Sequence, residues 1–242
     1  MRLSRIYCSQ HLATGVELRL EDDTLHYLRN VLRLQKDQQL LLFNEQDGEF
    51  TALITAVNKQ EMIVSVQEKQ RDAIAAALEI SLGLALSRGE RMDYGIQKST
   101  ELGVHAITPL ACEFCEARVK PERLDNRMRH WQKLVAAAAE QSNRMDLPLI
   151  EEPKLFEEWI TQRDGAPNLL FHPGGTDELP ARLEGKRVRV TIGPEGGFSD
   201  GEVALARSNG VLVCALGPRV LRTETAPVVA LAVLQHRYGD LG

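Results

Sequence analysis

The chain has 242 residues, 43% of them hydrophobic, and a formal net charge of −5, a composition typical of an ordinary globular protein. The negative charge argues against indiscriminate binding of polyanions, because lysine and arginine must neutralise the phosphates. Four scattered cysteines do not make a disulfide scaffold, and the first residues lack the apolar core of a signal peptide, so we expect a cytoplasmic protein.

Short strand-like runs separated by turn residues occupy residues 1–70 and predict a small antiparallel barrel or sandwich. The expected strands cover residues 5–7, 16–20, 39–43, 49–57 and 62–66. Between the second and third strands, a helix capped by Asp22 or Asp23 is expected to run to Val31. The basic residues on and near this helix are compatible with a basic patch, made of Arg2, Arg5, Arg29 and Arg33.

Residues 71–78 are predicted to be a linker, after which residues 79–242 alternate strands with helices. Gly103 is expected to end one helix, Pro121 to open a long one and Ser199 to cap another with Glu202. The expected strands are 79–86, 106–110, 168–171, 188–192 and 211–215. The expected helices are 90–102, a long one from 121, 155–161, one from 199, and 225–238. The stretch 226–234 of the last helix is apolar on all sides apart from Pro227, so this helix must be buried inside the domain or against another subunit.

Two glycine-proline loops each follow a short β-branched run and precede a helical pattern. The first is T-I-G-P-E-G-G-F at residues 191–198, and the second is L-G-P-R-V-L-R-T-E-T-A at residues 216–226. In α/β sheets, loops at the carboxyl ends of strands bind small ligands. Neither loop has the spacing of a phosphate-binding or dinucleotide fingerprint, so ATP or NAD is not indicated. Taken alone, the first loop is equally compatible with a tight turn.

The sequence gives little support for a metal site or for nucleophilic acyl transfer. Cys112 and Cys115 have the spacing of half a zinc site, but no second close pair of ligands accompanies them, so we expect no metal. No G-x-S-x-G nucleophile motif is present. The polar clusters at 88–91 and 140–144 are compatible with a cleft but also with a solvated surface, and Lys98 and Glu101 have the spacing of a simple helical ion pair.

Several motifs together resemble the RsmE family of 16S ribosomal RNA uridine N3-methyltransferases, within the SPOUT superfamily. They are S-R-G-E-R-M-D at 87–93, I-Q-K-S-T-E-L-G-V at 96–104, E-Q-S-N-R at 140–144 and the two loops, with R-I-Y at 5–7 and V-L-R at 31–33. The resemblance covers nearly the whole chain. It implies a PUA-like β-barrel that binds RNA, followed by a trefoil-knotted α/β methyltransferase domain, and a homodimer in the cytoplasm.

The resemblance further implies that S-adenosylmethionine is the cofactor and that 16S rRNA within the small ribosomal subunit is the partner, without membrane or metal. The implied cofactor-binding residues are Leu170, Phe171, His172, Pro173, Ile192, Gly193, Pro194, Glu195, Gly196, Gly197, Leu216, Gly217, Arg219, Val220, Leu221, Thr225 and Ala226.

Methyl transfer to uracil N3 requires removal of a proton and accommodation of an anionic base. We expect Arg222 to stabilise charge on a uracil carbonyl oxygen. Glu195 is expected to act either as proton acceptor or as a brace for the loops. The expected RNA-binding residues are Arg5, Arg29, Arg33, Arg88, Lys98 and Arg144. A non-catalytic, RNA-binding ribosome assembly factor is the alternative, and a nucleotide-dependent enzyme is a weaker one.

Overall fold

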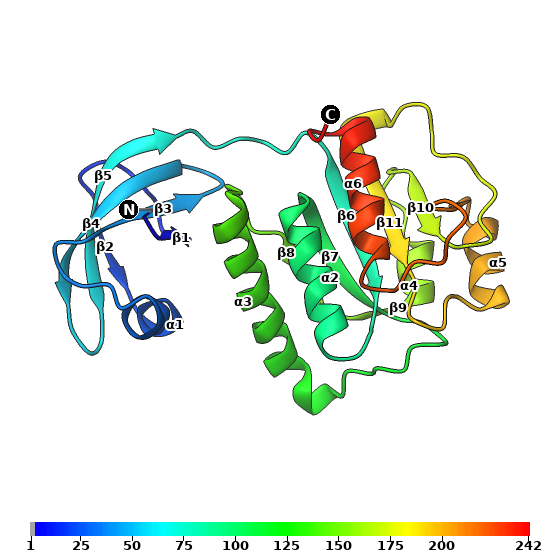
Figure 1. Ribbon diagram of the computed structural model, residues 1–242, viewed down its shortest axis with the longest axis horizontal. Helices are drawn as coiled ribbons and strands as arrows, with labels where there is room; N and C mark the ends of the chain where they lie inside the picture. The colour runs from blue at the N-terminus through cyan, green and yellow to red at the C-terminus, as the bar shows by residue number, and fades with distance from the viewer. Residues whose placement is uncertain (1–2) are drawn as a thin grey trace. The chain divides into compact units, whose positions relative to one another are not determined.

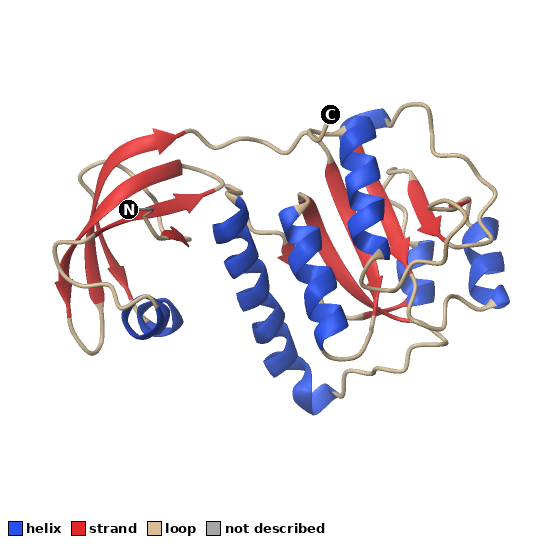
Figure 2. Cartoon of the chain, in the orientation of Figure 1, coloured by secondary structure: helices blue, strands red, loops and turns tan. Residues whose placement is uncertain are grey.

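The computed structural model describes residues 3–242, so Arg2 lies outside the described residues. The chain divides into two compact units. The first comprises the residues up to Ala75 together with Ala139–Asp146, and the second comprises Ala76–Ala138 and Leu147–Gly242. Figure 1 labels the elements of both units, and Figure 2 distinguishes their helices and strands.

A five-stranded sheet forms the first unit, in the order β1-β3-β4-β5-β2. Its strands are β1 (Arg5–Tyr7), β2 (Glu17–Leu20), β3 (Gln39–Asn44), β4 (Gly48–Val57) and β5 (Met62–Arg71). All neighbours are antiparallel except β1 and β3, which are parallel. The expected strands are confirmed, although β5 extends five residues beyond its predicted end at Val66, into the expected linker. The parallel pairing of β1 was not predicted, since pairing partners leave no local signal.

Alternation of side chains explains why these segments form strands. In β5, Met62, Val64 and Val66 are buried, whereas the intervening Ile63 and Ser65 are only partly so. This period of two places one row of apolar side chains in the core. The expected helix after β2 is split into α1 (Asp22–His26) and a π-helical turn at Tyr27–Val31.

The segment Ala139–Asp146 packs on the first unit, whereas the sequence pattern places it with the rest of residues 79–242. The physical reason is Arg5, whose guanidinium donates to the carbonyl oxygens of Ala139 and Arg144 and pairs with Glu49. A backbone N–H of β1 adds to this, because Tyr7 donates to Glu140 Oε1 at 3.2 Å.

A parallel sheet in the order β12-β10-β11-β6-β7-β8 forms the second unit, and β9 also pairs with β7. The strands are β6 (Glu79–Ala85), β7 (Val104–Ala111), β8 (Leu149–Ile150), β9 (Lys154–Leu155), β10 (Asn168–Phe171), β11 (Arg187–Ile192) and β12 (Leu212–Cys214). The helices are α2 (Glu90–Glu101), α3 (Leu124–Ser142), α4 (Phe156–Thr161), α5 (Asp200–Ser208) and α6 (Ala226–Tyr238), with 3-10 turns at Pro121–Arg123 and Glu184–Lys186. The two-residue strands β8 and β9 were not predicted, because they are too short to show a period.

Helices cover both faces of this sheet and create two apolar cores. One core contains side chains of α2, α3 and α6, among them Met92, Trp131 and Leu231. The other contains side chains of α4 and α5, among them Trp159 and Ala206. Central strands between two helical layers are buried on both sides, which explains the largely apolar run of β6. In β11 the buried polar side chains Arg189 and Thr191 are both hydrogen-bonded to Trp159.

Helix termini follow the predicted signals. Ser199 Oγ accepts from the amide of Glu202, and Glu202 Oε2 accepts from the amide of Ser199, which confirms the capping box of α5. Gly103 has φ +80° directly after the C-cap of α2. Within residues 3–242, no helix is long and apolar enough to cross a membrane.

Candidate functional site: a pocket between two loops

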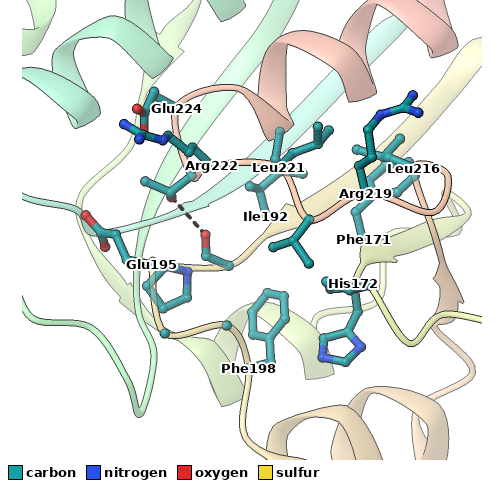
Figure 3. A pocket seen from close by; sticks show the side chains of 18 of the residues that line it. Phe171, His172, Ile192, Glu195, Phe198, Leu216, Arg219, Leu221, Arg222 and Glu224 are labelled. Atoms are coloured by element: carbon teal, nitrogen blue, oxygen red, sulfur yellow. Dashed lines mark hydrogen bonds between the residues drawn. The ribbon is translucent and has the colours of Figure 1, made fainter.

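A pocket of about 490 Å³ lies where the three strands β10, β11 and β12 end. Phe171 of β10 pairs with Ile192 of β11 and with Cys214 of β12, so the loops that follow β11 and β12 start side by side. Figure 3 shows side chains from these loops around the pocket. A cavity of this size suits a ligand of cofactor dimensions.

The two loops are tied together and shaped by glycines. Thr223 Oγ1 in the second loop donates to the carbonyl oxygen of Gly193 in the first at 3.0 Å, drawn as a dashed line in Figure 3. Gly197 closes a turn by donating its N–H to Pro194 O at 2.9 Å and has φ +73°, while Gly217 has φ +90°. These backbone conformations favour glycine, so the loops depend on these residues.

Apolar side chains form much of the pocket lining. Phe171, Ile192, Phe198, Leu216 and Leu221 all contribute (Figure 3). The second loop also presents Val220, which is 80% exposed.

Charged groups gather at one end of the pocket around Arg91 of α2. Its Nη1 donates to Glu195 Oε1 at 3.0 Å, and its Nε lies 4.0 Å from Glu224 Oε2. The hydrogen bond to Glu195 raises the pKa of Arg91 above its ordinary value. Glu224 Oε2 is buried and has no hydrogen-bond partner among the described residues. Arg222 lies toward this end, whereas Arg219 lies at the opposite end with Leu216 (Figure 3).

The predicted cofactor residues converge on this pocket with two exceptions. Leu170 is fully buried in the core on the α4 and α5 side, and Thr225 is the N-cap residue of α6, so neither lines the pocket. All the others line it, as does Arg222. Lining residues not predicted are Arg91, Phe198, Thr223 and Glu224. The sequence could have identified these four residues as pocket residues, since they lie in or beside the motifs S-R-G-E-R, I-G-P-E-G-G and L-R-T-E-T.

The predicted RNA-binding residues do not form one group. Arg5 is buried with 9% exposure, its guanidinium lies 3.5 Å from the Phe43 ring centroid, and it pairs with Glu49. Its predicted contact with RNA phosphate does not fit this geometry, because its charge and its donors are engaged inside the first unit. Arg29 and Arg33 of the same unit are exposed.

The remaining candidates each have an acidic neighbour. Arg88 lies 3.3 Å from Glu116, and Lys98 donates to Glu101 at 2.7 Å, as the helical spacing predicted. Arg144 belongs to the first unit, where it pairs with Asp146 at 2.7 Å. The pair of Arg88 is exposed, so it is weak and does not prevent a second contact, whereas Lys98 and Arg144 are partly buried in their pairs. Over residues 3–242, no group of three or more histidine, cysteine or acidic side chains is placed to hold a metal ion.

Comparisons with known proteins agree with this arrangement. A family model described as an RNA methyltransferase domain matches residues 75–235, and one described as an RNA methyltransferase PUA domain matches residues 20–67. The ribosomal RNA small subunit methyltransferase E of Buchnera aphidicola subsp. Schizaphis graminum is 35% identical, over 99% of this chain and 98% of that protein. The enzyme of the same name from Rickettsia conorii is 30% identical, over 96% and 95%.

Solved structures extend the likeness to the whole fold. A methyltransferase of Legionella pneumophila in complex with SAM matches with a TM-score of 0.93 and 37% identity, covering 100% of both chains. The ribosomal RNA small subunit methyltransferase E of Neisseria gonorrhoeae, bound to S-adenosyl methionine, matches with a TM-score of 0.89 and 30% identity, again over 100% of both chains. The mixed α/β fold with a PUA-like domain and a methyltransferase domain, and the end-to-end similarity in sequence, establish that this chain belongs to the ribosomal RNA small subunit methyltransferase E family.

Proposed function

We propose that this protein transfers a methyl group from S-adenosylmethionine to N3 of a specific uridine in the 16S rRNA of the small ribosomal subunit. The observation that carries the proposal is the pocket between the loops at residues 192–198 and 216–226, in a chain of this family. Relatives that match over their full length were solved with this cofactor bound.

The residues of the pocket fit the cofactor. A Cβ on Gly193 would lie 3.0 Å from the Phe198 ring, and a Cβ on Gly196 would lie 2.8 Å from Phe114 Cβ, so glycine at these positions lets the loop backbone pack close to its neighbours. The apolar lining suits the adenosine part. At the charged end, Glu224 Oε2, which has no hydrogen-bond partner among the described residues, suits the positively charged amino or sulfonium group.

When bound, S-adenosylmethionine supplies an electrophilic methyl group. The protein holds the cofactor and the uracil in line, which makes the reaction effectively unimolecular. Arg222 is exposed and lines the pocket, and its side chain makes no hydrogen bond or ion pair among residues 3–242. Its guanidinium is therefore available to stabilise negative charge on a uracil carbonyl oxygen.

The acceptor of the N3 proton is one of the two carboxylates at this end. Glu195 accepts a hydrogen bond from Arg91, which favours its role as a brace for the first loop. Glu224 has an oxygen without a hydrogen-bond partner and is the second candidate. A base must reach the proton directly or through one water, so the position of the bound uracil decides between them.

The first unit, as the PUA-like domain, holds the RNA. Arg29 and Arg33 are exposed on it and suit phosphate contacts, and Arg88, Lys98 and Arg144 are weaker candidates because of their acidic neighbours. Phosphate contacts position an RNA without specifying its sequence, so the choice of uridine depends on an unpaired or flipped base and on shape.

Further elements of the proposal rest on the family resemblance. They are a trefoil knot in the second domain, a homodimer in the cytoplasm and no requirement for metal. The domain bounds, 1–70 and 79–242 with a linker at 71–78, rest instead on the change of sequence pattern, and the segment Ala139–Asp146 is added to the first unit by its packing. The exposed apolar side chains Tyr94 on α2 and Val233 on α6 support a dimer face, since these two helices contact each other.

The test is to incubate the protein with labelled S-adenosylmethionine and small subunits from cells that lack this modification, and then to map the labelled base. We expect one uridine labelled at N3, with strong labelling of assembled subunits and weak labelling of naked RNA. A protein that binds subunits but shows no cofactor binding by calorimetry would instead be the non-catalytic assembly factor.

A further inference from the structure

Two cysteines sit at the ends of one tight turn directly after β7. The amide of Cys115 donates to the carbonyl oxygen of Cys112 at 3.2 Å, which is the hydrogen bond of a four-residue β-turn. Such a turn brings its first and last Cα atoms within about 7 Å, close to the range that a disulfide spans. Both cysteines are free thiols.

The two thiols differ in exposure and in acidity. Cys112 is buried with 9% exposure, whereas Cys115 is half-buried and reachable from solvent. The Cys112 amide donates to Cys115 Sγ at 3.3 Å. The hydrogen bond from the Cys112 thiol, together with backbone amides, lowers the pKa of Cys115 to about 7, and the pKa of Cys112 is raised. Because the thiolate is the nucleophile, Cys115 is the attacking thiol of the pair.

The turn lies directly behind the first loop of the pocket. Phe114, inside the turn, is so close to the loop that a Cβ on Gly196 would lie 2.8 Å from Phe114 Cβ. The amide of Glu113 donates to Glu202 Oε1 at 2.9 Å, and Glu202 caps the helix α5 that follows the loop. Cys112 itself shares an apolar cluster with Phe198, which lines the pocket.

We propose that Cys112 and Cys115 form a reversible thiol–disulfide site that reacts with low-molecular-weight disulfides such as glutathione disulfide, and that its closure weakens ligand binding in the pocket. In the first step, the Cys115 thiolate attacks the small disulfide, forms a mixed disulfide and releases one small thiolate. In the second step, Cys112 loses its proton and attacks Cys115 Sγ, which expels the second small thiolate. The protein loses two electrons and two protons, and the small disulfide is reduced to two thiols.

Closure acts on the pocket through the turn. An S–S bond of about 2.05 Å draws the two sulfurs together and replaces the hydrogen bonds that Cys115 Sγ now makes. The turn is expected to change shape, and Phe114 packs closely against the loop, since a Cβ added at Gly196 would lie 2.8 Å from Phe114 Cβ. The loop at residues 193–197 is therefore displaced together with the turn.

The chemical step is tested on the full-length protein. After equilibration with glutathione disulfide, free thiols are blocked, the protein is digested and the peptides are analysed by mass spectrometry. We expect a Cys112–Cys115 disulfide in the wild-type protein and a stable mixed disulfide at Cys115 in Cys112→Ser. We expect Cys115→Ser to react at least about tenfold more slowly at this turn, since the remaining thiol is buried. Wild-type protein whose two thiols stay free, or equal reactivity of the two variants, would overturn the proposal.

The effect on the pocket rests on the proposed function, since its readout is S-adenosylmethionine binding. Calorimetry on the reduced and on the disulfide form is expected to show about tenfold weaker binding to the disulfide form, restored by dithiothreitol. Equal affinities would refute the coupling to the pocket. If the reduced protein failed to bind S-adenosylmethionine, the proposed function would be refuted. Peptide mapping would still show whether Cys112 and Cys115 form a disulfide.

Discussion

Arg91 Nη1 lies 3.0 Å from Glu195 Oε1 and joins helix α2 to the loop after β11. The same guanidinium faces Glu224 of the second loop at 4.0 Å, so one cation stands between two carboxylates on separate loops. Without it, the two like charges would repel each other and the loops would separate.

We therefore expect Arg91→Ala to weaken S-adenosylmethionine binding by about tenfold, with part of the affinity recovered in Arg91→Lys. Calorimetry measures the affinity. Arg129→Ala is the matched control, because Arg129 is exposed on α3 and does not line the pocket. Wild-type affinity in Arg91→Ala would mean that the loops hold their positions without this residue.

Replacement of Arg222 should lower the rate of methyl transfer more than the affinity for the cofactor. Arg222→Ala is expected to lower the methylation rate by about 1000-fold or more, because a charge-stabilising group is lost from the transition state. Cofactor affinity should stay within about tenfold of wild type, since the other lining residues remain. Single-turnover assays on small subunits, run beside calorimetry, separate the two effects. Normal turnover in the variant would remove Arg222 from the mechanism.

Replacement of Arg5 should lower the stability of the protein, whereas replacement of Arg29 should weaken RNA binding, although both residues were expected to contact RNA. Arg5→Ala leaves Glu49, which is 4% exposed, with Arg71 as its remaining cation, and it should destabilise the protein by about 3–5 kcal/mol. Arg29→Ala should leave urea unfolding unchanged and weaken binding to small subunits several-fold, in a salt-dependent manner. If Arg29→Ala bound subunits like wild type at low salt, the exposed side chain would not be a phosphate contact.

Ionisation of Glu140 should lower the free energy of unfolding as the pH rises. Burial, opposed by the Tyr7 amide and Arg5, raises the pKa of Glu140 to about 7. A carboxyl group whose pKa is raised by folding contributes its full stability below its unfolded pKa, and that contribution is lost as pH rises through the folded pKa. Between pH 5 and 8, the wild type should lose at most about 3 kcal/mol relative to Glu140→Gln, which keeps the acceptor for Tyr7. Urea unfolding followed by circular dichroism at both pH values measures the difference. If the free energies of unfolding of the wild type and of Glu140→Gln changed equally with pH, the raised pKa of Glu140 would be contradicted.

Much of the fold was predictable from local patterns. Strand and helix positions follow from alternation, apolar runs and capping residues such as Ser199 and Gly103, because these signals act over a few neighbouring residues. The two glycine-proline loops also identified most of the pocket, since loops after adjacent parallel strands meet at one edge of a sheet.

Only the tertiary structure decided what the charged residues do. In the sequence, Arg5 and Arg29 are members of a predicted basic patch and Arg91 of a polar cluster at 88–91, with nothing local that separates their roles. Folding buries Arg5 against Glu49, leaves Arg29 in solvent and places Arg91 between Glu195 and Glu224. The partners lie 44 and 104 positions away in the chain, so no local pattern could identify them. The sequence determined which segments form helices, strands and loops, because local conformational preferences depend on neighbouring residues. Burial and charge pairing were decided only by the tertiary structure, because they arise when distant segments pack together.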